Sequence, residues 1–123
     1  MKFEILNSSV TELNTDSICI PYYKNNDKNT DLNLANKSID NILNDLEEKN
    51  QISSNIGAIT NIYTLNKLNS KQLILVGMGD EKDLNYEKIR KVSGNLGRFL
   101  NTMKNNSTSI IISGAGNDNL EFN

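Results

Sequence analysis

The sequence predicts an α/β fold, because strand-like and helix-like segments alternate along the chain. Two apolar runs, Leu73–Val76 and Thr108–Ser113, are typical of strands that are covered on both faces. A segment with a helical spacing of apolar residues precedes the second run. A strand reached after a helix usually lies parallel to the strand before that helix, so we expect a largely parallel sheet.

Two strands are expected at the start of the chain. Phe3, Ile5 and Val10 bracket the first, and Ser17–Tyr23 is the second, ending at Pro21 or at the polar run behind it. The second strand contains Cys19. We interpret Cys19 as a buried, inert thiol, because the chain has no histidine that could activate it.

A loop and a long helix should follow. Lys24–Thr30 is wholly polar and rich in asparagine, as loops are. Thr30 or Asp31 is expected to cap a single helix of about four turns, with one apolar and one polar face. Its apolar positions are Leu32, Ala35, Ile39, Ile42, Leu43 and Leu46.

The next two segments are strands of different character. Ile56–Leu65 mixes β-branched, aromatic and polar residues in alternation, which suits a strand near the edge of the sheet. Asn66–Ser70 turns the chain. Leu73–Val76 is apolar throughout and is expected at the centre of the sheet.

The second helix should begin at Asn85, whose side chain can accept a hydrogen bond from the first turn, while Glu87 favours the same end electrostatically. Ser93, Gly94 and Gly97 lie beside its apolar stripe. A glycine inside a helix costs about 1 kcal/mol relative to alanine, so we interpret these small residues as allowing close approach to the sheet. Gly97→Leu would then destabilise the fold by about 1–3 kcal/mol through overpacking. The stripe itself is Ile89, Val92, Leu96, Phe99 and Met103.

Glycine turns at the ends of two strands are the candidate ligand-binding residues: Gly77, Gly79, Gly114 and Gly116. Ligands in open α/β sheets bind at the carboxyl ends of strands, where backbone N–H groups can hold a phosphate. A purely structural role is the alternative. The third glycine of a dinucleotide fingerprint is missing, because Lys82 stands at its position, and the chain has no phosphate-loop motif.

Length, charge and composition bear on the number of domains, the partners and the location of the protein. The 123 residues suit one domain spanning 1–123, and a net charge of −2 with a pI of about 5.1 argues against a nucleic-acid partner. The sequence shows no signal-like or membrane-spanning run, so we expect a cytoplasmic protein. The acidic pairs Glu47–Glu48 and Asp80–Glu81 are interpreted as solvated charges. We assign no catalytic and no metal-binding residue.

The strand, turn and second helix together carry a family resemblance. Val76-Gly-Met-Gly79, a charged loop, and Ile89-Arg-Lys-Val-Ser-Gly94 with Arg98 and Leu100 resemble the N-terminal domain of the leucyl (cytosol) aminopeptidases. The resemblance implies a macrodomain-like fold: three αβα layers around a mixed, mostly parallel sheet. It also implies that the chain is a truncated, non-catalytic domain.

The activity that the resemblance implies belongs elsewhere in such proteins. A C-terminal catalytic domain with two divalent metals, zinc or manganese, removes N-terminal residues from peptides within a hexamer, and no segment here matches its signature. That catalytic domain and further copies are therefore the expected partners, with a role for this domain in assembly or access. Two alternatives stay open: a stand-alone macrodomain-like module that binds ADP-ribose or a related nucleotide, and a small interaction or structural domain without a ligand.

Overall fold

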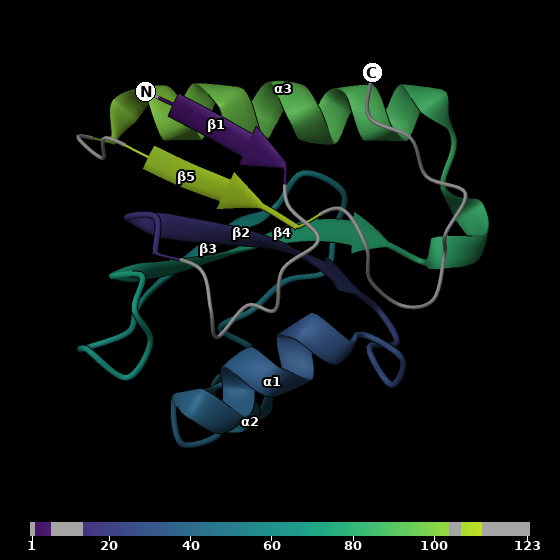
Figure 1. Ribbon diagram of the computed structural model, residues 1–123. Coiled ribbons are helices and arrows are strands. Elements are labelled where there is room, and N and C mark those ends of the chain that lie inside the picture. Colours follow the sequence, from purple (N-terminus) through teal and green to yellow (C-terminus); the bar gives the residue numbers. More distant parts are fainter. Residues whose placement is uncertain (1, 6–13, 104–106, 112–123) are drawn as a thin grey trace.

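The computed structural model describes the backbone of residues 2–5 and all atoms of residues 14–103 and 107–111 (Figure 1). A short 3-10 helix, Glu81–Asp83, lies between β4 and α3. The other elements in chain order are β1 (Lys2–Ile5), β2 (Ser17–Tyr23), α1 (Thr30–Ser38), α2 (Ile42–Glu48), β3 (Ile59–Tyr63), β4 (Gln72–Gly79), α3 (Tyr86–Thr102) and β5 (Ser107–Ile110).

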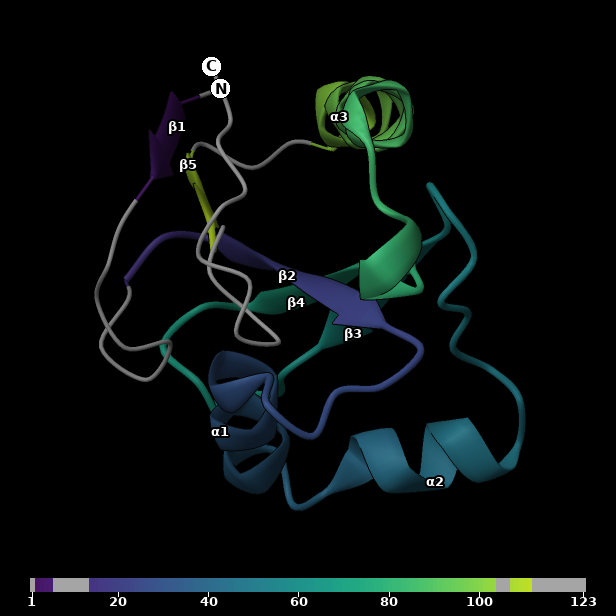
Figure 2. The same cartoon turned by 90° about the vertical axis from the view of Figure 1, so that its right-hand side faces the viewer.

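The strands form one five-stranded sheet in the order β1-β5-β2-β4-β3. β1, β5, β2 and β4 run parallel, and β3 is an antiparallel edge strand beside β4. α3 covers one face of the sheet, whereas α1 and α2 cover the other (Figure 2). The predicted α/β fold with three layers and a mixed, mostly parallel sheet is confirmed.

Alternation along two of the interior strands, β2 and β4, builds a core on each face of the sheet. In β2, Ile18 and Ile20 face the α1–α2 side and Cys19 faces α3; in β4, Leu73 and Leu75 alternate in the same way with Ile74, Val76 and Met78. Successive side chains of a strand point to opposite faces, so one apolar run supplies both cores. The predicted burial of Leu73–Val76 on both faces is confirmed.

Hydroxyl groups fix the pairing of β2 with β5 at the start of both strands. Ser17 Oγ and Thr108 Oγ1 lie 2.8 Å apart in the interior, and Thr15 Oγ1 lies 2.7 Å from Ser109 Oγ. A buried hydroxyl without a partner is costly, so a register shift would be unfavourable.

The predicted single long helix is wrong, because the chain breaks it into α1 and α2. Asp40 and Asn41 between them adopt positive φ angles of 60° and 61°. Short polar side chains enter this left-handed region more easily than others, so the helix can stop there although its apolar spacing continues. The predicted cap is also wrong, since Asn29 rather than Thr30 or Asp31 is the N-cap of α1.

Most strand predictions are confirmed, with changes at their ends. β2 spans the predicted residues and passes through Pro21, and β3 is the edge strand but is shorter than Ile56–Leu65. β4 neighbours the central strand β2, so the prediction that it is itself central is wrong. Val10 and the end of the predicted strand Thr108–Ser113 lie outside the described residues.

The cap of α3 is confirmed, but the role given to its glycines is wrong. Asn85 Oδ1 accepts from the backbone N–H of Lys88 at 2.9 Å. A Cβ on Gly97 would meet no atom within 4 Å, and one on Gly94 would meet only the side chain of Arg98. These residues therefore leave space beside the sheet instead of allowing tight contact with it.

Candidate functional site

The carboxyl ends of β2 and β4 lie side by side. Gly77 and Gly79 are among the last three residues of β4. One more backbone hydrogen bond connects the two strands after β2 ends: the N–H of Lys24 donates to the carbonyl of Gly79 at 3.0 Å. The N–H groups of both glycines are already engaged: Gly77 donates to Ala58 O and Gly79 donates to Ser54 O, each at 2.7 Å. An anion would have to displace these backbone bonds.

The same two positions also require glycine for local reasons. A Cβ on Gly77 would lie 2.0 Å from the carbonyl oxygen of Asn55, and Gly79 has a positive φ of 68°. The segment before β3 thus crosses directly over the end of β4, which only a residue without a side chain permits. Gly114 and Gly116, the other two candidates, lie outside the described residues.

A polar hollow of about 310 Å³ lies beside this strand end, between the loop after β2 and the short 3-10 helix. Three lysines and three carboxylates surround it, so its formal charge sums to zero and it favours neither anions nor cations. We call it the mixed-charge hollow. Its lining residues are Lys24, Asn25, Asp27, Lys28, Asp80, Glu81 and Lys82.

Asparagine side chains hold the loop after β2 in place. Asn26 Oδ1 accepts from the N–H of Tyr23 at 2.9 Å, and Asn26 Nδ2 donates back to the carbonyl of Tyr23. Asn29 Nδ2 donates to the carbonyl of Pro21 at 2.9 Å. Side-chain amides that replace backbone partners in this way give a polar loop a defined shape.

Burial keeps one thiol and two phenol groups of β2 protonated at neutral pH. Burial raises the pKa of the Cys19 thiol to about 12, as expected for an inert cysteine. Burial, followed by the negative charge of Glu81, raises the pKa of Tyr23 to about 12. Burial and a hydrogen bond to Glu47, with a 2.8 Å oxygen distance, also raise the pKa of Tyr22. None of these groups can act as a base or nucleophile without losing a strongly held proton.

The described part of the chain holds neither a cluster of metal ligands nor a membrane-spanning helix. Among residues 14–103 and 107–111, no cluster of three or more histidine, cysteine, aspartate or glutamate side chains could hold a metal ion. None of the helices in that part is long and apolar enough to cross a membrane.

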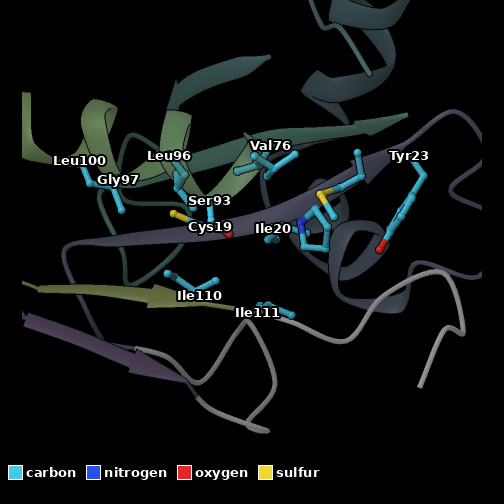
Figure 3. Close-up of a pocket in the computed structure, with 13 residues that line it drawn as sticks. Cys19, Ile20, Tyr23, Val76, Ser93, Leu96, Gly97, Leu100, Ile110 and Ile111 are labelled. Atoms are coloured by element: carbon cyan, nitrogen blue, oxygen red, sulfur yellow. The ribbon is translucent and has the colours of Figure 1, made fainter. Parts of the chain in front are cut away.

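A second, apolar hollow of about 280 Å³ lies between α3 and the sheet (Figure 3). We call it the apolar groove and define it by residues of β2, β4, α3 and the end of β5. Figure 3 shows Tyr23 toward one end and Leu100 toward the other. Its lining residues include Cys19, Tyr23, Ser93, Gly97, Ile110 and Ile111.

The sequence pointed to two residues of this groove, but it did not predict that they border an open hollow. Ser93 and Gly97 stood out as small residues beside an apolar stripe, and that signal correctly located an unusual face of α3. It could not show whether the space above them is filled by the sheet or left open, because this depends on where α3 lies across the strands. Nothing in the sequence singled out Tyr23.

A family model described as "Cytosol aminopeptidase family, N-terminal domain" matches residues 19–121. A probable cytosol aminopeptidase of Clostridium perfringens is 32% identical over 105 residues, covering 85% of this chain and 20% of the relative. One from Alkaliphilus oremlandii is 26% identical over the same length, covering 85% and 21%. The chain therefore spans about a fifth of the length of these relatives.

A solved structure with the same fold is the macrodomain of Mycobacterium tuberculosis DarG. Its TM-score is 0.71, and the match covers 98% of this chain and 82% of that one. The sequences are only 13% identical, so this likeness shows the macrodomain-like fold alone.

Proposed function

Because the chain belongs to the cytosol aminopeptidase family, as its N-terminal domain, we propose that it is the non-catalytic domain of an enzyme that removes N-terminal residues from peptides. The observation that carries the proposal is the family match over residues 19–121, together with relatives that are probable aminopeptidases about five times as long as the matched segment. Residues 1–123 would form one domain of that longer protein.

We place the chemistry in the part of the protein beyond this chain. The described residues do not fit a metal pair, since they hold no suitable cluster of ligands, and the whole chain lacks histidine. Two divalent metals, zinc or manganese, would belong to the C-terminal catalytic domain. That domain and other copies in a homohexamer would be the partners, and this domain would influence assembly or access. We propose a cytoplasmic location and no nucleic-acid partner, in keeping with the net charge of −2.

The glycines at the end of β4 serve a structural role in this proposal. The N–H groups of Gly77 and Gly79 hold the segment before β3, and the neighbouring hollow has balanced charge. The alternative of a stand-alone ADP-ribose module is not favoured, because the sequence relatives are aminopeptidases and the macrodomain likeness concerns the fold only.

An activity assay tests the proposal. Purified residues 1–123 should not hydrolyse leucine p-nitroanilide with added zinc or manganese, whereas the full-length protein should do so with one of them. Activity that follows the 123-residue chain through successive purification steps would contradict the assignment. So would a full-length protein that is folded and metal-loaded but inactive on a panel of aminoacyl p-nitroanilides.

A further inference from the structure

The helical cover on the α3 face of the sheet is incomplete in the described part of the chain. α3 packs mainly on β4 and β3, at one side of the five-stranded sheet. A helix is about 10 Å wide and strands are about 4.8 Å apart, so one helix covers roughly two strands. The apolar groove lies along the edge of this cover, over β2, the end of β5, and Val76 and Met78 of β4.

The groove is built to hold an apolar surface. Carbon atoms form nearly all of its lining, and Cys19 in its floor is a protonated thiol. On α3, a Cβ at Gly97 would point into open space, so the helix presents a hollow and not a ridge at this position. Most of the lining residues are already buried, and a second apolar surface would remove the apolar atoms that still contact water in the hollow from solvent.

A buried hydroxyl group without a hydrogen-bond partner belongs to a residue at one end of the groove. Tyr23 is only 1% exposed and lines the groove. Its hydroxyl group has no hydrogen-bond partner among the described residues. Buried hydroxyl groups in native proteins are almost always paired, so an occupant of the groove should bring an acceptor or donor to this end.

The last residue of β5 and the residue after it line the groove. Ile110 and Ile111, at the end of β5, both line it, and Ile111 N–H donates to the carbonyl of Cys19 at 2.9 Å. About four-fifths of the length of the aminopeptidase relatives lies outside the segment that matches this chain. The longer protein thus has ample polypeptide to supply cover beside the last strand.

We propose that the apolar groove is the docking site of an amphipathic helix from the part of the full-length protein beyond residue 123, an inference that rests on the proposed function. Its apolar face would cover the sheet over β2 and β5, and one polar side chain or carbonyl would pair with the Tyr23 hydroxyl. The groove would then be the surface through which this domain is fixed to the remainder of the enzyme.

Cysteine labelling in the native proteins tests the proposal. Two reporters line the groove, Ser93→Cys and Gly97→Cys, and Lys91→Cys, at an exposed position of the same helix, is the matched control. Each variant is made in residues 1–123 and in the full-length protein and treated with N-ethylmaleimide. Mass spectrometry of the peptides separates each reporter from Cys19 and from any other cysteine.

Both groove reporters should react readily in the 123-residue chain and at least about tenfold more slowly in the full-length protein, because labelling there requires the helix to leave. Lys91→Cys should react at the same rate in both. Equal rates for the groove reporters in the two proteins would overturn the proposal. Protection already present in the 123-residue chain would also overturn it, because the groove would then be covered by the chain's own residues or by a small molecule.

Hydrolysis of leucine p-nitroanilide by the same full-length variants separates the two ideas. An active enzyme with unprotected groove reporters would leave the proposed function standing and remove the docking site. A full-length protein that is inactive without any substitution would contradict the proposed function itself.

Discussion

Asn29 shows how a single side chain joins sheet, loop and helix. It is fully buried, its Nδ2 donates to the carbonyl of Pro21 in β2 at 2.9 Å, and its Oδ1 accepts from the N–H of Leu32 in α1 at 3.4 Å. The N-cap of α1 was predicted one or two residues later, because Thr30 and Asp31 are equally good capping types. The hydrogen bonds that its Nδ2 donates to the carbonyl of Pro21 and to Asn26 Oδ1 distinguish Asn29 from these neighbours.

Replacing Asn29 should therefore cost more than replacing another asparagine of the same loop. Asn29→Ala removes the cap and leaves the Pro21 carbonyl with one bond fewer, so the free energy of unfolding should fall by about 1–3 kcal/mol. Asn25→Ala, at an exposed position, should change it by less than about 0.5 kcal/mol. Urea denaturation of both variants measures the difference, and equal effects would show that Asn29 does not connect the elements.

The raised pKa of Cys19 predicts a loss of stability in alkali. Its thiol has an ordinary pKa of 9.0 and a folded-state pKa of about 12. The protonated thiol is favoured in the folded protein, so its contribution is complete below pH 9 and is lost as the pH rises to about 12. Over that range Cys19 alone should lower the free energy of unfolding by up to about 1.4 kcal/mol per pH unit.

Cys19→Ala isolates this effect. The variant should be less stable at pH 7 because of the lost packing, but its stability should fall less steeply between pH 9 and 12. Tyr23, whose pKa is also about 12, titrates in both proteins and so leaves the comparison unaffected. Denaturation curves taken across this range would contradict the account if the two profiles ran parallel.

At the scale of elements, local patterns predicted most segments but not their interruptions. The apolar run in β2 and the cap at Asn85 were sufficient because burial and capping act within a few residues. The break at Asp40–Asn41 was missed, since the apolar spacing continues across it and two short polar residues give only a weak stop signal. The roles of Gly77 and Gly97 depend on contacts with distant segments, which the pattern along one element does not contain.

The two glycines should respond in opposite directions to the same substitution. Gly97→Ala should raise the free energy of unfolding by about 1 kcal/mol, because alanine favours the helix and its Cβ meets open space. Gly77→Ala should lower it by about 1–3 kcal/mol, because its Cβ would collide with the carbonyl of Asn55. Thermal unfolding followed by circular dichroism measures both changes. Destabilisation by Gly97→Ala would restore the idea of a close helix–sheet contact there.

At the scale of the whole molecule, the sequence predicted the layers and the family, but not the arrangement that creates the candidate sites. Alternating strands and helices, together with the resemblance at Val76–Gly79, were sufficient for a mixed, mostly parallel sheet. α3 packs on β4 and β3, at one side of the sheet, and this offset leaves the apolar groove. Such a hollow results from long-range packing, so no local spacing of residues could have predicted it.

The central claim is that this chain is the N-terminal domain of a longer aminopeptidase, and sequencing the transcript beyond the codon for Asn123 tests it most directly. The account predicts that the open frame continues for about three times the length of this chain, in proportion to the relatives, with the ligands for two divalent metals in its C-terminal part. A stop codon directly after Asn123, in a transcript without a neighbouring catalytic segment, would contradict it.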